Sequence, residues 1–430
     1  MSTTVIKGTV ITAKSRHELS VLEHAEIVTE DGIIQEVAQH RSEPYQHLPV
    51  TDLEDAIIIP SFSDLHIHAP QYTERGVGMD CLLFDWLNNY TFPQEAKFQD
   101  VRYAKTIYAQ LIRDLLRHGT TQANFFTTIH YDSCDLFFHM LEESGMYAFT
   151  GKINMDRNSP DYYVEDTETS IHETERFLQE HQNSDHVKPM IIPRFAPTCT
   201  KELLEGLGNL AKTTNAGLHT HLVESIGEAA WSKELFPECA SDGEIYERTG
   251  LLNVSGPKIF AHVIFPTETE DRIFEQYHAV AVHCPDATAN ITAGIMPVSR
   301  LLDQKYHIAE GTDIGGGHSP AVYRSISHSV QLSKLKEFYE PENHRLSFAE
   351  AFWMATANGG EVFGNIGKIE PGYRFNALIL RPMQDEGFQI SPLEALERFC
   401  YIGDDRDILE RYIDGIKVDP EGIYQKLIRM

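Results

Sequence analysis

Residues 57–68 read IIIPSFSDLHIH, and this stretch decides the fold of the chain. Its apolar, β-branched run predicts a buried strand that ends in His66 and His68. Alternate residues of a strand point to the same side, so the two imidazoles project together. Two neutral imidazoles on one side of a rigid strand supply half of a four-ligand zinc site. Because an H-x-H pair also occurs in ordinary strands, the rest of the chain has to supply the other ligands.

The amino-acid composition argues against several classes of binding partner. The 430 residues include 36 Lys and Arg against 64 Asp and Glu, which gives a formal net charge of −28. Such a field repels polyanions, so we expect neither nucleic acid nor an anionic membrane surface as a partner. None of the six cysteines forms a C-x-x-C pair, which argues against a disulfide scaffold or a thiolate zinc site. With no recognisable leader or membrane-spanning run, we expect a cytoplasmic protein.

Strand-like and helical segments alternate from residue 57 onward. The strand-like runs are 57–68, 121–129, 147–155, 187–195, 217–224, 258–265, 279–284 and 308–313. Residues 93–118, 167–182 and 201–213 between them have helical periodicity. Eight such alternations predict an α/β fold with a (β/α)8 barrel of the TIM type. A doubly wound open sheet is the alternative, but no glycine-rich fingerprint follows any of these strands.

The two ends of the chain differ from this alternating pattern, because their sequences predict short strands joined by turns. We expect residues 1–56 and 366–430 to pair into one small β-sandwich domain. Residues 57–365 then form the barrel that carries the active site.

Polar side chains stand at the ends of the predicted strands. In a barrel of parallel strands, such residues meet at one mouth. These residues are His66, His68, Arg194, His221, Glu224, His262, His283 and Asp313. Three histidines and one carboxylate fill the protein side of a catalytic zinc site and leave a position for water, whose pKa bound zinc lowers to about 7. Iron can compete for the same ligand types.

Short sequence motifs along nearly the whole chain resemble those of the amidohydrolase superfamily. They are PSFSDLHIHAPQY, HGTT, PRFAPTC, HTHLVES, AHV, HCP and GTD. The more specific phrases HAPQY, DWLNNYTFP, VKPMIIPRF and YIGDDRDI are similar to the guanine deaminases, in the ATZ/TRZ-like branch of that superfamily. The resemblance implies zinc-dependent hydrolysis of guanine, a purine base, to xanthine and ammonia by a homodimer with one metal ion per subunit.

The resemblance also implies roles for individual residues. The metal ligands would be His66, His68, His221 and Asp313. The catalytic residues would be Glu224 as proton shuttle, His262 as the group that orients the attacking water, and Asp313 as acceptor of its proton. The purine would be bound by Gln71, Arg194 and Phe195, together with His221, Glu224 and Asp313.

The chemistry of guanine hydrolysis supports these roles independently of the family resemblance. Hydroxide has to attack guanine C2, and protons are then needed on a ring nitrogen and on the leaving amine. Glu224, three residues beyond His221, can carry them. Arg194 can donate to a carbonyl oxygen and Gln71 offers both a donor and an acceptor. Each residue also has an ordinary structural interpretation, such as a helix cap for Glu224 or a core histidine for His262.

Several alternatives stay open at this point. His219 rivals His221 as a ligand, but we prefer His221 because it lies nearer the strand end and has Glu224 three residues beyond it. His283 fits a supporting position better than a ligand position. The family usually carries Asn where this chain has Asp286, and His318 is an addition in the GGGHSP loop. These departures leave a sister amidohydrolase possible, acting on oxidised guanine, a pterin or a triazine. A catalytically silent scaffold barrel is a third reading, which the filled ligand positions disfavour.

Overall fold

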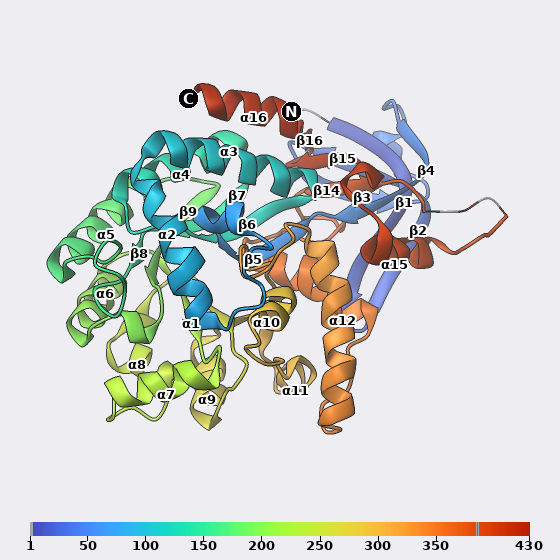
Figure 1. Ribbon diagram of the computed structural model, residues 1–430. Coiled ribbons are helices and arrows are strands. Elements are labelled where there is room, and N and C mark those ends of the chain that lie inside the picture. The colour runs from blue at the N-terminus through green and yellow to red at the C-terminus, as the bar shows by residue number, and fades with distance from the viewer. Residues whose placement is uncertain (1–2, 384, 386) are drawn as a thin grey trace.

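The computed structural model describes residues 3–383, 385 and 387–430, and its main body is a parallel barrel (Figure 1). The barrel strands are β5 (Phe62–His68), β6 (Thr120–Phe126), β7 (Tyr147–Gly151), β8 (Ile153–Asn154), β9 (Val187–Pro193), β10 (Gly217–Leu222), β11 (Lys258–His262), β12 (Val280–His283) and β13 (His307–Glu310). Their order is β13-β12-β11-β10-β9-β7-β6-β5, with β8 continuing β7 and pairing with β9. All these pairs are parallel, so the predicted (β/α)8 barrel is confirmed.

The barrel closes between its first strand and the segment after its last. Asp313 N donates to His66 O at 2.8 Å, and His68 N donates to Ile314 O at 2.7 Å. A buried apolar cluster takes residues from eight of the nine strands, all but β10, and among its fully buried members are Leu65, Phe126, Ile192, Ile259, Val282 and Ala309. Residues from so many strands can meet only inside the barrel, which is therefore a packed core below its mouth.

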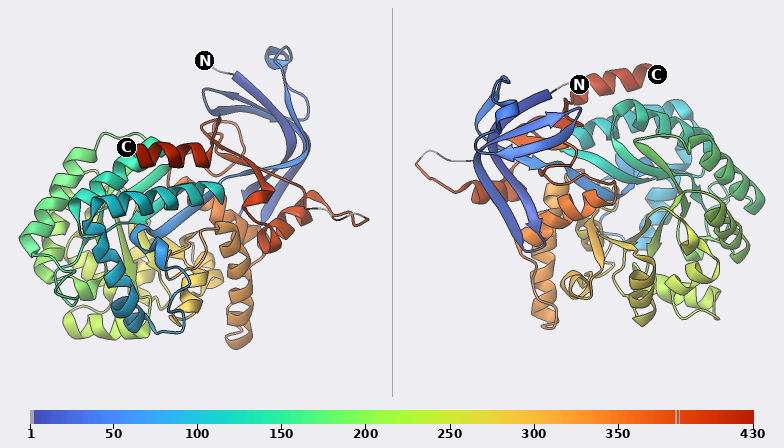
Figure 2. Two further views of the ribbon diagram at one scale, coloured as in Figure 1. Left: turned by 45° about the horizontal axis from the view of Figure 1, so that its top comes forward. Right: turned by 180° about the vertical axis from the view of Figure 1, so that it is seen from behind.

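Helices surround the barrel on the outside (Figures 1 and 2). They are α3 (Val101–Arg117), α4 (Tyr131–Ser144), α5 (Thr167–His181), α6 (Lys201–Thr213), α7 (Ile226–Leu235), α8 (Asp242–Arg248), α9 (Glu268–Tyr277), α10 (Pro285–Asn290), α11 (Val298–Asp303), α12 (Val322–Tyr339) and α13 (Phe348–Trp353). In α3 the buried residues Tyr108, Leu111 and Leu115 recur at helical spacing and face the strands. Among the described residues, every helix is too short or too polar to cross a bilayer.

The segment predicted as one helix over 93–118 is divided. Residues Phe92–Glu95 form α2, Ala96–Gln99 make a 3-10 turn, and α3 begins only at Val101. The Asp100 side chain accepts a hydrogen bond from Arg102 N at 2.9 Å and so caps α3. The remaining helical elements are α1 (Leu83–Trp86), the π-helical turns η3 (Leu87–Thr91) and η7 (Met354–Asn358), α14 (Gly359–Glu361), α15 (Pro392–Ile402) and α16 (Pro420–Arg429), besides 3-10 turns at Glu43–Tyr45, Ala69–Glu74, Ala196–Thr198, Leu251–Asn253 and Asp405–Asp407.

A second sheet joins the two ends of the chain. Its strands are β1 (Thr3–Ser15), β2 (Glu18–Glu30), β3 (Ile33–Ala38), β4 (Thr51–Pro60), β14 (Ala377–Leu380), β15 (Ile408–Ile413) and β16 (Ile416–Lys417). The order is β16-β15-β14-β4-β1-β2-β3, so β4 lies between β1 and the C-terminal strand β14. The terminal β unit is confirmed and forms one mixed sheet of seven strands, seen beside the barrel in Figure 2.

The stretch 57–68 was predicted as a single strand, and that prediction is wrong. Residues 57–60 complete β4 in the terminal sheet, whereas residues 62–68 form β5 in the barrel. The chain changes sheets at Ser61, whose N donates to Asn376 O at 3.0 Å, while Phe62 N donates to Gly119 O at 3.0 Å. Residues 57–60 of β4 and all of β5 are buried, so the apolar run continues across the change of sheet. The division into domains is a separate matter and stays a prediction.

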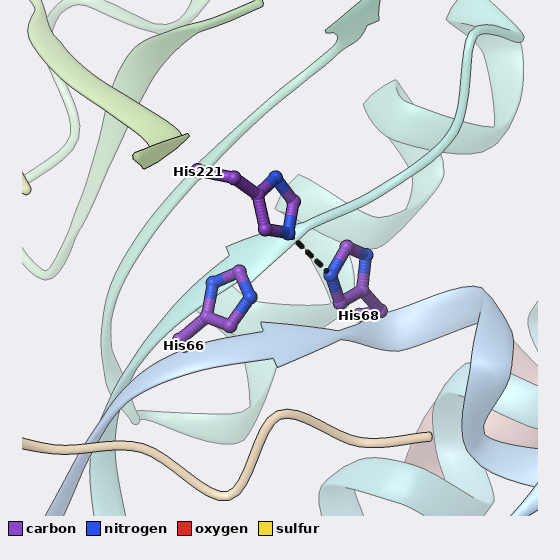
Figure 3. Close-up of side chains that lie close together, drawn as sticks. All are labelled: His66, His68 and His221. Atoms are coloured by element: carbon purple, nitrogen blue, oxygen red, sulfur yellow. Dashed lines mark hydrogen bonds between the residues drawn. The ribbon is translucent and has the colours of Figure 1, made fainter. Parts of the chain in front are cut away.

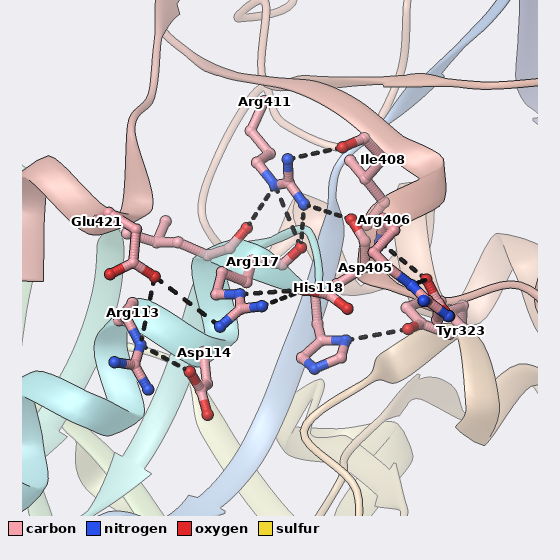
Figure 4. A network of polar contacts seen from close by, with 12 residues as sticks. Arg113, Asp114, Arg117, His118, Tyr323, Asp405, Arg406, Ile408, Arg411 and Glu421 are labelled. Carbon is pink, nitrogen blue, oxygen red and sulfur yellow. Dashed lines mark hydrogen bonds and ion pairs between the residues drawn. The ribbon is translucent and has the colours of Figure 1, made fainter.

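A polar network ties the C-terminal segment to the end of α3 (Figure 4). Arg411 Nε donates to Leu116 O at 3.0 Å, and Arg411 Nη1 donates to Ile408 O at 2.7 Å. Arg117 Nη2 pairs with Asp405 Oδ2 at 2.8 Å. The contact with Leu116 O reaches one of the carbonyls that a helix leaves open at its C-terminus, whereas the Arg117 pair adds a salt bridge.

Candidate active site

The residues predicted at the strand ends lie together at the C-terminal mouth of the barrel. His66 and His68 belong to β5, His221 to β10, and His262 is the last residue of β11. Arg194 directly follows β9, while Glu224 and Asp313 lie in the loops after β10 and β13. A hollow lined by both polar and apolar side chains opens there. Its lining residues are His68, Gln71, Leu83, Trp86, Leu87, Arg194, Phe195, His221, Glu224, His262, Ile291, Asp313 and Gly316.

Three imidazoles and one carboxylate converge at the bottom of this hollow. Figure 3 shows His66 and His68 rising from β5 toward His221. His68 Nε2 lies 3.2 Å from His221 Nε2. Asp313 Oδ1 lies 3.2 Å from His66 Nε2 and 3.5 Å from His68 Nε2. Atoms that share one ion at 2.0–2.2 Å stand about 3–3.5 Å apart, so these spacings match those of a metal site.

The hydrogen bonds of two imidazoles direct their lone pairs toward this common point. His221 Nδ1 lies 2.6 Å from Arg194 O, and because a carbonyl only accepts, that nitrogen carries the proton. His221 Nε2 therefore keeps its lone pair. His66 Nδ1 contacts His219 Nε2 at 2.9 Å, while His66 Nε2 has no hydrogen-bond partner among the described residues. Buried, unpartnered nitrogens that face a carboxylate are what a cation site requires.

Burial keeps the imidazoles neutral. It lowers the pKa of His66 to about 3, with Arg194 as a further cause. Burial, followed by neighbouring imidazoles, also lowers the pKa of His68 and His221 well below the ordinary value. The same burial raises the pKa of Asp313 well above its ordinary value. Neutral imidazole is the form that binds a metal, so the three histidines have the protonation state of ligands, whereas Asp313 has to lose its proton when a cation binds.

Glu224 and His262 lie beside the ligand cluster. His262 Nε2 is 3.5 Å from Glu224 Oε1 and 3.7 Å from Asp313 Oδ2. Burial, with the charge of Asp313 as the second cause, raises the pKa of Glu224 to about 8. A carboxyl group with such a pKa can both give and take a proton near neutrality. Glu228 fixes the Glu224 backbone, because its Oε2 accepts from Glu224 N at 2.7 Å.

His219 and His283, the other histidines named near the strand ends, do not line the hollow. His219 contacts the far side of His66, where it can fix that ring, and it does not line the hollow. His283 is the last residue of β12 and is buried, with its Nδ1 unpartnered among the described residues.

The two positions that depart from the family pattern have partners of their own. Asp286 pairs with His328, and His318 Nδ1 lies 3.1 Å from Asn290 Nδ2.

One wall of the hollow carries Gln71, Arg194 and Phe195, the residues predicted to bind a purine. All three are at least 94% buried. The ring centroid of Phe195 lies 6.3 Å from that of His221. Arg194 Nη1 pairs with Glu95 Oε2 at 2.8 Å, and its guanidinium lies 5.2 Å from the centroid of the Phe92 ring. The wall therefore combines an apolar ring with polar groups, as a planar heterocycle needs.

Backbone strain gathers at the mouth. Val223, His262, Val263 and Asp313 all have positive φ, at 45°, 74°, 50° and 49° respectively. Such values are uncommon for residues other than glycine and cost energy, especially for the two valines. Strain of this kind clusters at functional sites, where the surrounding structure enforces it.

Several residues of the site were missed by the sequence analysis. Trp86 and Leu87 line the hollow from the segment DWLNNYTFP, which was noted only as a resemblance. Asp64 ties β5 to the loop that carries Asp313, because its Oδ1 accepts from Thr312 N at 2.9 Å. Asp64 belongs to residues 57–68, but an aspartate in a strand can equally be a charged residue at the strand end. The residue type alone therefore does not predict the hydrogen bond to Thr312.

Comparisons with known proteins agree with this geometry. The model of the Amidohydrolase family matches residues 57–418. A guanine deaminase from Dictyostelium discoideum is 34% identical over 96% of this chain and 98% of its own length. One from Escherichia coli K12 is 32% identical over 85% of this chain and 84% of its own. A crystal structure of guanine deaminase from C. acetobutylicum with guanine in its active site has a TM-score of 0.94 and 39% identity, covering 97% of this chain and 100% of that one.

Proposed function

The chain belongs to the amidohydrolase family, a family of metal-dependent hydrolases, and on that premise we propose that it hydrolyses guanine to xanthine and ammonia. The observation that carries the proposal is the single hollow in which a ligand cluster faces the wall of Gln71, Arg194 and Phe195. The similarity to a guanine deaminase with bound guanine, at 39% identity over nearly the whole chain, supports the choice of base.

We propose zinc as the metal, held by His66, His68, His221 and Asp313. Imidazole and carboxylate ligands suit zinc, although iron binds the same ligand types. A bound zinc ion supplies Lewis-acid activation of a water molecule at neutral pH. The unpartnered Nε2 of His66 and the facing Nε2 atoms of His68 and His221 support this set.

The protein's own groups then have to move two protons. Hydrolysis forms a C–O bond at guanine C2 and breaks the bond from C2 to the exocyclic nitrogen. One proton of water ends on ring nitrogen N3 and the other on the departing amine. In our proposal Glu224 takes one proton from the attacking water and delivers it to N3. Asp313 takes the second proton and returns it through Glu224 to the departing amine, while His262 holds the attacking oxygen in line. The 3.5 Å spacing of Glu224 and His262 supports this division of roles.

The wall residues are proposed to hold the purine. Phe195 offers an apolar face, Arg194 donates toward the carbonyl oxygen, and Gln71 offers a donor and an acceptor at the edge. His221, Glu224 and Asp313 contact the reacting end of the ring. Trp86 and Leu87 add apolar surface opposite these polar groups and exclude water.

We also propose a cytoplasmic homodimer. The six cysteines are all unpaired, which supports a reducing compartment. Phe338 and Tyr339 near the end of α12 are 77% and 76% exposed, and exposed apolar groups of this kind support an interface between subunits. Light scattering of the purified protein tests the dimer.

The test of the activity is direct. Purified, zinc-loaded protein should release ammonia from guanine, with xanthine as the second product, and should leave adenine and cytosine unchanged. If it were inert to guanine but active on an oxidised guanine, a pterin or a triazine, the substrate assignment would be wrong and the hydrolytic chemistry right. Inertness to the whole panel would remove the proposed activity.

A further inference from the structure

Glu95 lies behind the wall of the hollow and joins two of its residues. It is the last residue of α2 and is fully buried. Its Oε1 accepts from Gln71 Nε2 at 2.7 Å, and its Oε2 accepts from Arg194 Nη1 at 2.8 Å. Glu95 does not line the hollow itself. Any effect of Glu95 on the hollow is therefore exerted through the two side chains that do line it.

The contacts of Gln71 fix which end of its amide is which. A carboxylate only accepts, so the group of Gln71 that faces Glu95 is the NH2 group. The opposite end accepts from Gly315 N at 3.0 Å, and a backbone N–H only donates. Both contacts demand the same orientation of the amide. Gln71 is left with one N–H and one oxygen lone pair for other partners.

The second carboxylate oxygen places the guanidinium of Arg194. This side chain is 97% buried, and a buried cation needs a counter-charge. Its pairing with Glu95 supplies that charge and leaves other N–H groups of the fork toward the hollow. Together, Arg194 and the remaining N–H of Gln71 make this wall mainly a hydrogen-bond donor.

We propose that Glu95 is a positioning residue that sets the donor character of this wall and thereby selects purines with an oxygen at C6. This inference rests on the proposed function and deepens it. Guanine presents an acceptor to the wall through its C6 oxygen. 2,6-Diaminopurine has the same C2 amino group, but its C6 amino group is a hydrogen-bond donor that would face the N–H donors of Arg194 and Gln71. Discrimination between them is greatest where buried polar groups are left unpaired.

Changing Glu95→Gln breaks this arrangement without a change of size. Glutamine has one acceptor end and one donor end, whereas Gln71 and Arg194 both need an acceptor. If the new amide accepts from Arg194, its NH2 group faces the NH2 group of Gln71. Gln71 can turn to relieve that clash, but its NH2 group then faces the N–H of Gly315. The wall loses either a contact or its fixed donor pattern.

The experiment measures kcat and KM for guanine and 2,6-diaminopurine with metal-loaded protein. In Glu95→Gln we expect kcat/KM for guanine to fall about 10- to 100-fold, mainly through KM, as for a lost hydrogen bond to a charged group. We expect the preference for guanine over 2,6-diaminopurine to fall at least about tenfold. Metal content should match that of the wild type. A preference unchanged in the folded variant would overturn the inference.

Glu165→Gln is the matched control, because Glu165 is another buried carboxylate paired with a buried cation, Lys152, and neither lines the hollow. A purely structural effect of removing such a charge would appear in both variants, whereas the preference should change only in the Glu95 variant. Should Glu95→Gln fail to fold, Glu95→Asp keeps the charge and shortens the reach. A lowered preference in Glu95→Asp supports the inference, and an unchanged one overturns it.

The inference and the proposed function fail in different ways. A wild-type protein that does not deaminate guanine contradicts the function. In that case, equilibrium binding of guanine and 2,6-diaminopurine to the wild type and the Glu95 variant still tests the role of Glu95. Equal binding preferences in the two proteins would overturn it.

Discussion

The backbone carbonyl of Arg194 lies 2.6 Å from His221 Nδ1, so one residue of the proposed purine wall also fixes a ring of the proposed metal site. Since the carbonyl forces the proton onto Nδ1, the lone pair of His221 Nε2 faces His68 Nε2 at 3.2 Å. Partners that orient a ligand imidazole in this way fix its tautomer and raise its basicity. The two halves of the site are thus joined through a main-chain group.

The first prediction concerns this ligand. The protein as purified should hold about one zinc ion per subunit, and His221→Ala should hold almost none, because it loses one of four ligands. Elemental analysis after dialysis measures both. His186→Ala is the control, since His186 stacks on Tyr147 away from the hollow and should leave the zinc content unchanged. A fully loaded His221 variant would show that this imidazole is not a ligand.

The second prediction separates catalysis from metal binding. Glu224→Gln should retain its zinc but lose turnover of guanine by about 10²- to 10⁴-fold, as expected when a general acid–base group is removed. The amide keeps the shape of the carboxyl group and cannot carry the proton. Glu238→Gln, a half-exposed position, is the control and should behave like the wild type. Turnover that survives in the Glu224 variant would contradict the proton-shuttle role.

Much of the barrel and the candidate site could be predicted from the sequence, for a physical reason. The ends of parallel strands meet at one mouth, so residues that are far apart in sequence, such as His66, His221 and Asp313, could be placed together from strand ends alone. The preference for His221 over His219 followed from the same rule, because His221 is nearer the end of β10. The structure places His221 Nε2 at the cluster and His219 behind His66.

The parts that were missed leave no periodic pattern in the sequence. The change of sheet at Ser61 is hidden because the last residues of β4, 57–60, and all of β5 are buried. Glu95 contacts Arg194, which lies 99 residues further along the chain. Its burial depends on how α2 packs below the mouth, and local spacing carries no information about that contact. Sequence reasoning of this kind therefore finds residues at strand ends more readily than the groups that support them.

The third prediction concerns pH. A hydrogen bond from His328 Nδ1 to Asp286 Oδ1 raises the pKa of His328 above its ordinary value of 6.5. A group whose pKa is higher in the folded state stabilises the fold fully below its unfolded pKa, and this contribution is lost as the pH rises through the folded pKa. The free energy of unfolding should therefore differ most between the wild type and His328→Asn below the ordinary pKa of 6.5, and the difference should shrink as the pH rises above that value.

Asp286→Asn serves as the control for that experiment. In its background, the change His328→Asn should no longer alter the pH dependence, because the partner that raises the pKa is gone. Urea unfolding at several pH values measures all four proteins. A difference between the wild type and His328→Asn that stays constant across this pH range would contradict the role of the pair.

The fourth prediction concerns the network that holds the C-terminal segment on α3. Arg411 donates to the carbonyls of Leu116, Arg117, Asp405 and Ile408, and its burial lowers its pKa to about 10. Changing Arg411→Met keeps most of the apolar stem but removes the side-chain donor from all four carbonyls, of which Leu116 O and Asp405 O keep backbone donors, Gly119 N and Ile408 N. Removing the partner of buried polar groups costs more than one exposed hydrogen bond, so we expect a loss of about 2–4 kcal/mol in the free energy of unfolding.

Urea unfolding measures that loss, and hydrogen exchange locates it. The amides of the last turn of α3 and of β15 should exchange faster in Arg411→Met, because local opening there no longer breaks the arginine contacts. Arg406→Met is the control, since the Arg406 side chain is 84% exposed and its pairing with Asp404 is screened by water. Equal stability of Arg411→Met and the wild type would mean that water replaces the guanidinium at these carbonyls, and the network would then align the segment without stabilising it.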